Sequence, residues 1–280
     1  MKRLLLGLIG AGIQRSLAPA LHEEEGRHHG LQVHYQLVDL DAAGVGVEVL
    51  PELVRAAHAI GFAGFNVTYP CKQLIIPLLD CLSDEARAIG AVNTVVRDAN
   101  RLVGHNTDGS GWSWGFRRAL PHADLERVVL LGAGGAGSAC GDAVLRLGAQ
   151  ELVIVDKDRA RACALAARLN EHLPGDRARA STELASAIAG ASGLIHATPT
   201  GMAGAPGMPL PEDLLRAAMW VSEVVYVPLE TPLLKAARRA GCAIVDGGHM
   251  NVGQAVDAFK LFTGEDADAS RMENHFRRMV

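Results

Sequence analysis

The 280-residue chain has few aromatic residues and little net charge. Phe, Trp and Tyr make up 4% of the chain, and 27 Lys and Arg stand against 31 Asp and Glu. Without an excess of basic residues, the protein has no overall positive field that would attract nucleic acid. The net charge of −4 together with 49% hydrophobic residues also excludes a disordered chain. We therefore expect a folded protein with no nucleic-acid partner.

The chain also lacks a cysteine framework and a membrane-spanning segment. Its five cysteines form no C-x-x-C pair and are scattered from Cys71 to Cys242, which argues against both a disulfide frame and a zinc site. No apolar run reaches the ~18 residues that a membrane span requires. We therefore expect no metal and no membrane partner, and a reducing, cytoplasmic compartment. The number of copies in the assembly is left open between a monomer and a homodimer.

The N-terminus can be read in two ways. Lys2 and Arg3 precede the apolar run from Leu4 to Ile9, and Ala18-Pro19-Ala20 follows, so the segment resembles a secretory signal with a cleavage site. However, proline is unfavourable at the centre of a cleavage site, and the unpaired cysteines argue against export. We expect residues 3–9 to form a buried first strand instead.

Glycine and aliphatic residues dominate the remaining composition, with 31 Gly in the chain. Short aliphatic segments alternate with amphipathic ones, as in α/β proteins whose parallel strands are apolar on both faces. We predict two α/β lobes: an N-terminal substrate domain and a Rossmann-type dinucleotide-binding domain. Residues 1–110 and 246–280 are expected to form the substrate-binding and catalytic domain, and residues 111–245 the dinucleotide-binding domain.

The clearest local motif is a glycine-rich turn between a predicted strand, 127–131, and a predicted helix, 137–147. It satisfies G-x-G-x-x-G in the strand–turn–helix context that the motif requires. The first glycine permits the tight turn, the second lets a pyrophosphate approach the backbone, and the third lets the helix pack on the sheet. A tight turn without a ligand is the alternative. The candidate cofactor residues here are Gly132, Ala133, Gly134, Gly135, Ala136 and Gly137.

Asp156 ends the next predicted strand, 151–155. An acidic residue there can accept hydrogen bonds from the ribose hydroxyls of NAD, and it repels the 2′-phosphate of NADP. Lys157, Arg159 and Arg161 follow and could receive that phosphate. The position of the acid favours NAD, with NADP as the alternative.

Three polar clusters in the first lobe are expected at the C-terminal ends of strands, where open α/β sheets bind ligands. They offer a cation, an acid, amides and hydroxyls, which suits a small polyhydroxylated carboxylic acid. Lys72 could act as an acid or base, and Asp108 could orient it. Each residue alone also fits a surface, cap or turn position. The clusters are Asn66 to Lys72, Asn93-Thr94, and Asn106 to Gly109.

Taken together and in order, these motifs resemble the shikimate dehydrogenase family along essentially the whole chain. Its NAD-dependent quinate/shikimate branch, which serves quinate catabolism, is the most similar, because Asp156 stands where NADP-using members usually carry Asn-Arg-Thr. The resemblance rests on Ser16 to Pro19 with His22, Asn66 to Lys72, Ala91 to Thr94, Asn106 to Gly109, Gly132 to Gly137, Ala197 to Met202, Asp246-Gly247, Met250 and Gln254 to Phe259.

The resemblance implies reversible hydride transfer at C3 between quinate or shikimate and its 3-dehydro form. It implies that Lys72 is the catalytic acid/base and that Asp108 is its partner. Substrate contacts are implied for Ser16, Ala18, Thr68, Asn93, Asp108, Tyr226 and Gln254, and contacts near the nicotinamide for Thr198, Val224, Gly247 and Met250.

Ala18 departs from the family pattern, because most members have a serine or threonine that contacts the substrate carboxylate. Losing that hydroxyl removes a hydrogen bond worth ~1 kcal/mol. An amino-substituted analogue as substrate, a biosynthetic NADP-dependent shikimate dehydrogenase, and a nucleotide-sensing regulator without turnover remain alternatives. The regulator is disfavoured because a binding-only protein needs neither Lys72 nor Asp108.

Overall fold

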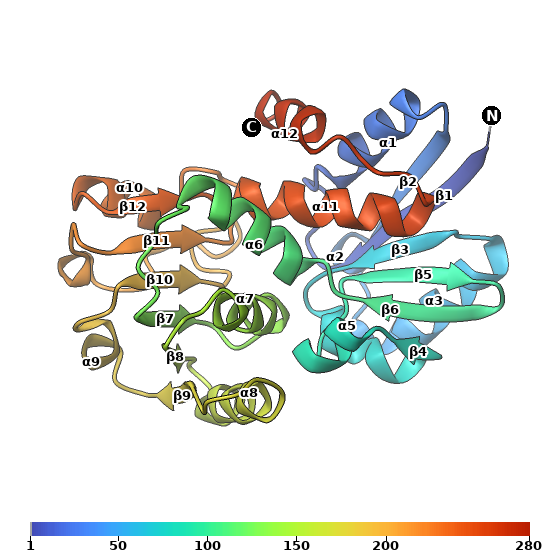
Figure 1. The fold of residues 1–280 in the computed structure, drawn as a ribbon. Coiled ribbons are helices and arrows are strands. Elements are labelled where there is room, and N and C mark those ends of the chain that lie inside the picture. The colour runs from blue at the N-terminus through green and yellow to red at the C-terminus, as the bar shows by residue number, and fades with distance from the viewer. Residues whose placement is uncertain (1) are drawn as a thin grey trace. The chain divides into compact units, whose positions relative to one another are not determined.

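The computed structural model describes residues 2–280, and this part of the chain folds into two compact units. Unit 1 comprises the residues up to Thr107 together with Gln254–Met279, and unit 2 comprises Asp108–Gly253. Each unit has its own six-stranded sheet with helices packed on it (Figure 1).

The sheet of unit 1 has the order β2-β1-β3-β5-β6-β4. β2, β1 and β3 run parallel, whereas β5 runs antiparallel to both of its neighbours. The strands are β1 (Arg3–Gly10), β2 (Gln32–Asp39), β3 (Gly64–Val67), β4 (Cys81–Leu82), β5 (Thr94–Asp98) and β6 (Arg101–His105).

Helices cover both faces of this sheet. Ile9 of β1 packs in one core cluster with Leu50 and Val54 of α3, while Leu6 and Leu8 pack in another with residues of α11. The helices are α1 (Ala18–His28), α2 (Leu40–Ala43), α3 (Leu50–Ile60), α4 (Cys71–Leu74), α5 (Asp84–Ile89), the unit 1 part of α11 (Gly247–Thr263) and α12 (Ala269–Arg277).

The sheet of unit 2 is wholly parallel, with the order β12-β11-β10-β7-β8-β9. Counted from the first strand of the unit, this is the 3-2-1-4-5-6 order of dinucleotide-binding folds, and the strand order reverses between β7 and β10. The strands are β7 (Arg127–Leu131), β8 (Glu151–Val155), β9 (Ala178–Ser181), β10 (Gly193–His196), β11 (Trp220–Glu223) and β12 (Ala243–Val245).

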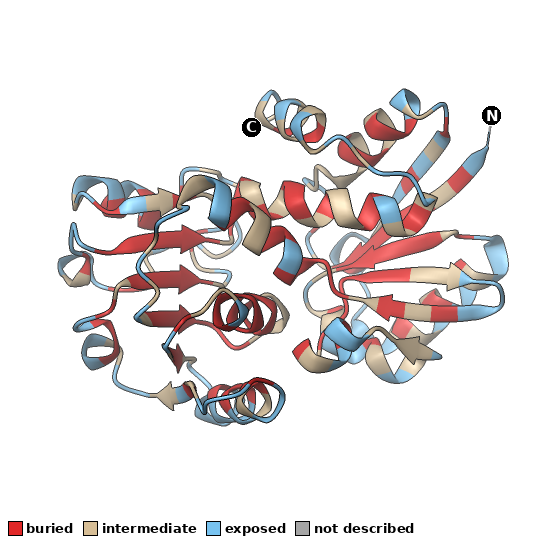
Figure 2. Cartoon of the chain, viewed as in Figure 1, coloured by how far each residue is buried: buried red, intermediate tan, exposed pale blue. Residues whose placement is uncertain are grey.

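Alternate side chains of β7 enter two different cores. Val128 and Leu130 pack with residues of α6, α7 and α8, whereas Val129 and Leu131 pack with residues of α9 and α10. The central strands are therefore buried on both faces, as Figure 2 shows. The helices are α6 (Asp108–Ala119), α7 (Gly135–Arg146), α8 (Arg159–His172), α9 (Leu184–Ile188) and α10 (Pro232–Arg239).

The predicted fold class is confirmed. The segment from Arg3 forms β1, which lies between β2 and β3 in the sheet. Within residues 2–280, no helix has the length and apolar character that a bilayer crossing needs. The division of the chain between the two compact units falls within α11, between Gly253 and Gln254.

Candidate active site

The unit 1 residues of the three polar clusters meet at one edge of its sheet. Thr68 follows the end of β3, and Asn106 follows the end of β6. The expected placement of Asn93 at the end of a strand is wrong, because it directly precedes β5. β5 is antiparallel to β3, so its beginning lies beside the end of β3. Asn93 therefore lies at the same edge as Thr68, although it precedes its strand.

A buried hydrogen-bond network fixes this edge. The Tyr35 hydroxyl donates to Asn66 Oδ1 at 2.7 Å, and Asn66 Nδ2 donates to Thr94 Oγ1 at 2.9 Å. Asn93 Nδ2 donates to Thr107 Oγ1 at 2.9 Å, and its Oδ1 accepts from the Thr107 N–H at 2.8 Å. These five residues are buried. Because buried polar groups are costly when unpaired, such a network holds its members in one arrangement.

The loop after β1, which carries Ser16, is held by Asp39 at the end of β2. The Asp39 carboxylate accepts from the N–H groups of Gly12 at 2.9 Å and Ile13 at 3.0 Å and from Gln14 Nε2 at 3.0 Å. Burial acts to raise the pKa of Asp39, but hydrogen bonds from Gln14 and from the N–H groups of Gly12, Ala42 and Asp41 outweigh it and lower the pKa. Ser16 Oγ then accepts from the Ala18 N–H at 3.3 Å, at the start of α1. Sequence reasoning did not identify Asp39, although an acid that ends a strand beside a glycine turn is a usable signal.

The predicted substrate residues divide between the two units. Thr68 lies against Gly10, and the carbonyl of Lys72 accepts from the Val92 N–H, directly before Asn93. Unit 1 holds Ser16, Ala18, Thr68, Lys72, Asn93 and Gln254. Asp108 and Tyr226 belong to unit 2, where Asp108 opens α6 directly after Thr107.

The glycine-rich turn of unit 2 has the geometry of a phosphate cradle. Gly132 has a φ of +100°, which favours glycine, and a Cβ at Gly137 would overlap the Gly132 carbonyl oxygen. Gly134 is the N-cap of α7 and no side chain caps that helix. The first N–H groups of α7 are thus left for an anion, and the positive end of the helix dipole favours one. Gly132 to Gly137 therefore fit the pyrophosphate of a dinucleotide.

Asp156 lies beside this turn and directly follows β8. Its Oδ2 accepts from the Ala133 N–H at 2.7 Å, and its Oδ1 accepts from the Asp158 N–H at 2.9 Å. A carboxylate has about four acceptor positions, so it keeps capacity for ribose hydroxyls. Arg161 of α8 also reaches the turn, because a Cβ at Gly134 would lie 3.6 Å from its Nη2. An acid and a cation therefore flank the expected adenosine end.

Two residues that sequence reasoning missed lie at the ends of β10 and β11. His196 Nδ1 and Glu223 Oε1 are 2.8 Å apart, and His196 Nε2 lies 2.5 Å from Thr198 Oγ1. His196 is 0% and Glu223 1% exposed. The available signal was an ionisable residue at the last position of each of two short, buried strands.

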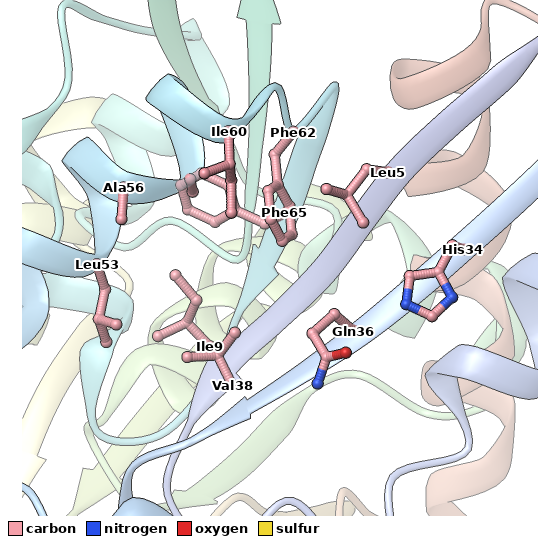
Figure 3. A pocket seen from close by; sticks show the side chains of 11 residues that line it. Leu5, Ile9, His34, Gln36, Val38, Leu53, Ala56, Ile60, Phe62 and Phe65 are labelled. Atoms are coloured by element: carbon pink, nitrogen blue, oxygen red, sulfur yellow. The ribbon is translucent and has the colours of Figure 1, made fainter.

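Unit 1 also has a cavity of about 310 Å³ with a mainly apolar lining (Figure 3). None of its lining residues is a predicted site residue, and its polar groups are limited to His34 and Gln36. A polyhydroxylated acid needs more hydrogen-bonding partners than that lining offers. The other lining residues are Leu5, Ile9, Val38, Leu53, Ala56, Ala57, Ile60, Phe62 and Phe65.

Among the described residues, the geometry indicates neither a metal centre nor a cysteine nucleophile. No cluster of three or more His, Cys, Asp or Glu suited to a metal ion occurs among residues 2–280. Cys71, next to Lys72, is 0% exposed, and burial raises the pKa of its thiol to about 11. A thiol with that pKa holds little thiolate at neutral pH, so Cys71 is a packing residue.

Comparison with known proteins identifies relatives along the whole chain. Residues 8–95 match the shikimate dehydrogenase substrate binding domain. The NADP-dependent shikimate dehydrogenase of Streptomyces avermitilis is 56% identical, over 96% of this chain and 93% of that protein. The NAD-dependent quinate/shikimate dehydrogenase of Corynebacterium glutamicum strain R is 46% identical, over 98% of each chain. The structure of quinate dehydrogenase from C. glutamicum in complex with NAD superposes with a TM-score of 0.90 at 44% identity, covering 99% of this chain and 100% of that one.

These relatives define a two-unit dehydrogenase with a dinucleotide-binding fold. The chain belongs to the shikimate and quinate dehydrogenase family, whose members are NAD(P)-dependent oxidoreductases that act on a CH–OH group. The predicted family membership is confirmed. The relatives include both NADP-dependent and NAD-dependent enzymes.

Proposed function

We propose that the protein is an NAD-dependent oxidoreductase that interconverts quinate or shikimate and the corresponding 3-dehydro acid. The observation that carries this proposal is the polar edge of unit 1, where the Val67 N–H donates to the Asn93 carbonyl and the Val92 N–H donates to the Lys72 carbonyl. An edge with a cation, hydroxyls and amides suits a small hydroxylated acid, and the family membership supports the same substrate class.

In this proposal, the side chains of unit 1 orient the substrate. Ser16 and Thr68 offer hydroxyls, and Asn93 and Gln254 offer amides, to the substrate carboxylate and ring hydroxyls. Ala18 opens α1 beside Ser16 and has no hydroxyl, so the carboxylate is bound with one donor fewer. The methyl group leaves room for a larger substituent at this point, which supports activity on quinate as well as shikimate.

Lys72 is proposed to move the proton. During oxidation its amine accepts the proton of the C3 hydroxyl, and during reduction it returns that proton to the carbonyl oxygen. Asp108 is proposed to orient Lys72 and to accept a hydrogen bond from a neighbouring hydroxyl. When bound, the nicotinamide supplies the acceptor for the hydride that leaves C3. Thr198, Val224, Gly247 and Met250 would line its site, with Tyr226 near the substrate.

The proposed preference for NAD rests on Asp156. Its carboxylate is fixed by two backbone N–H groups beside the glycine-rich turn. There it can accept hydrogen bonds from the ribose hydroxyls, and its charge disfavours a 2′-phosphate. Replacing Asp156 by Ser should raise kcat/KM with NADP at least tenfold and lower it with NAD. An unchanged ratio of the two values would remove Asp156 from cofactor selection.

An NADP-dependent shikimate dehydrogenase is the second candidate function. It is favoured by Arg161, whose guanidinium lies beside Gly134 and could bind a 2′-phosphate, and by the NADP-dependent relative at 56% identity. Arg161→Ala discriminates between the two candidates. It should weaken NADP binding at least tenfold if this alternative holds, and should leave NAD turnover within about threefold if it does not.

Lys72→Ala tests the proposed chemistry. Loss of a general acid/base lowers kcat by about 10²–10⁴-fold, and an interaction made only in the transition state changes KM little. Lys260→Ala is the matched control, because Lys260 is exposed and pairs with Asp266 at 2.6 Å. A Lys72→Ala enzyme whose kcat stays within fivefold of the wild type would exclude Lys72 from proton transfer.

A further inference from the structure

The His196–Glu223 pair is the most buried ionisable pair of the dinucleotide-binding unit for which a direct contact is described. His196 closes β10, Glu223 closes the neighbouring strand β11, and the two residues are directly paired in the sheet register. Charged groups are rarely buried unless they are paired and fully hydrogen-bonded. Packing alone does not require ionisable residues here, because an apolar pair of similar volume would fill the same space. The role of the pair must therefore lie in the hydrogen bonds that it makes.

The Glu223 carboxylate accepts hydrogen bonds from four donors. Oε1 accepts from His196 Nδ1, from the Val224 N–H at 2.9 Å and from the Val225 N–H at 3.0 Å, and Oε2 accepts from the Thr231 hydroxyl at 2.9 Å. Because a carboxylate only accepts, Nδ1 carries the ring hydrogen. Glu223 therefore fixes the orientation of the imidazole and also the backbone that leaves β11.

The other ring nitrogen holds Thr198. With the ring hydrogen on Nδ1, we assign Nε2 as the acceptor of the hydrogen bond from the Thr198 hydroxyl, whose Oγ1 lies 2.5 Å away. Thr198 Oγ1 in turn accepts from the Thr200 N–H at 3.3 Å. The Thr198 hydroxyl hydrogen thus points toward His196, and Oγ1 keeps a lone pair that can accept a hydrogen bond from a ligand.

Thr198 stands where the dinucleotide fold binds its ligand. It follows β10, and Gly132 follows β7, so the two residues flank the point at which the strand order reverses. A Cβ at Gly132 would lie 3.0 Å from the Thr198 methyl carbon. Gly247 also lies against the carbonyls of Val224 and Val225. The His196–Glu223 pair therefore anchors two segments at the switch point, through Thr198 and through Val224.

We propose that His196 and Glu223 are positioning residues for the dinucleotide: they orient the Thr198 hydroxyl as an acceptor toward the nicotinamide half of the cofactor. This inference rests on the proposed function, which assigns Thr198 to the nicotinamide end. The carboxamide NH₂ group of nicotinamide is the donor that an acceptor in this position would bind. ADP-ribose lacks the nicotinamide ring, so its affinity should not depend on the His196–Glu223 pair.

A double-mutant cycle with two ligands tests the proposal. Dissociation constants for NADH and ADP-ribose are measured on the full chain for Thr198→Val, His196→Gln and the double variant, together with kcat. Thr198→Val is isosteric and lacks the hydroxyl. It should raise the dissociation constant of NADH about tenfold and that of ADP-ribose less than twofold. In the wild-type background, His196→Gln should raise the dissociation constant of NADH by a similar factor. In the Thr198→Val background it should cause no further increase.

Further variants keep the test decisive. Thr198→Ser should recover most of the NADH affinity that Thr198→Val loses. Thr182→Val removes a hydroxyl from an exposed position of the same unit and should change neither constant. If His196→Gln does not fold, Glu223→Gln replaces it in the cycle, because it is isosteric and disturbs the imidazole orientation.

Two outcomes contradict the proposal in distinguishable ways. Additive losses in the double variant, or equal weakening of NADH and ADP-ribose, would overturn the positioning role while leaving the proposed function in place. A wild-type protein that binds no dinucleotide would overturn the proposed function and this inference together.

Discussion

Acid is expected to destabilise unit 1 through His22 of α1. This side chain is fully buried, with its ring centroid 5.0 Å from that of Tyr35 and 5.7 Å from that of Phe262. Neither ring nitrogen has a hydrogen-bond partner. Burial lowers the pKa of His22 from 6.5 to about 4, and the charge of Glu25 opposes that shift only in part.

The size of the effect follows from linkage between protonation and folding. The folded pKa lies below the unfolded one, so between pH 6.5 and 4 the unfolded chain binds the proton more readily, and stability falls as the pH falls. From the two pKa values, the free energy of unfolding should decrease by about 2 kcal/mol between pH 7 and pH 5 because of His22 alone. Below pH 4 the folded form is protonated as well, and the contribution becomes constant.

Urea unfolding of the wild type and of His22→Leu, followed by circular dichroism at pH 5 and pH 7, measures this contribution. The variant should lose about 2 kcal/mol of the wild-type pH dependence, whatever its absolute stability, because other groups titrate equally in both proteins. His34→Leu, which removes a histidine whose side chain is 68% exposed, is the matched control. Equal pH dependence in wild type and His22→Leu would refute the reasoning.

Three further predictions concern the site. Gly137→Ala should lower the thermal stability of unit 2 by about 2 kcal/mol or more and weaken NAD binding, because its Cβ meets backbone, whereas Gly204→Ala has open space and should do neither. Asn93→Ala should cost about 2 kcal/mol or more in urea unfolding, because it leaves buried polar groups unpaired; a smaller loss would mean that water replaces the amide. Iodoacetamide at pH 8, followed by mass spectrometry, should modify exposed Cys163 well before buried Cys71; equal rates would contradict the raised pKa.

The regular part of the fold was predictable because its signals are local. The predicted strands 127–131 and 151–155 are aliphatic runs, and they match β7 and β8 to the residue. β9 was not predicted, because Ala-Arg-Ala-Ser has neither branched nor aromatic residues and forms an edge strand. The hairpin-like turn at Ala99-Asn100 correctly predicts that β5 pairs antiparallel with β6. The antiparallel pairing of β5 with β3 was not predicted, since it joins residues distant in sequence.

The candidate site was predictable to the extent that its motifs are contiguous. The glycine-rich turn and Asp156 are close in sequence, and the structure joins them through the Ala133 N–H. The supports of the site were not predictable, because each unites distant residues: Asp39 holds the loop at Gly12, and Glu223 holds His196. Such pairs are brought together only by the sheet.

The initial rate of reduced cofactor formation is the most direct test of the central claim. Purified protein is assayed at 340 nm with quinate and with shikimate, each with NAD and with NADP, and Lys72→Ala is assayed beside it. We predict turnover of at least one of the two acids, a higher kcat/KM with NAD than with NADP, and loss of activity in Lys72→Ala. Absence of turnover with both acids, or a clear preference for NADP, would contradict the account.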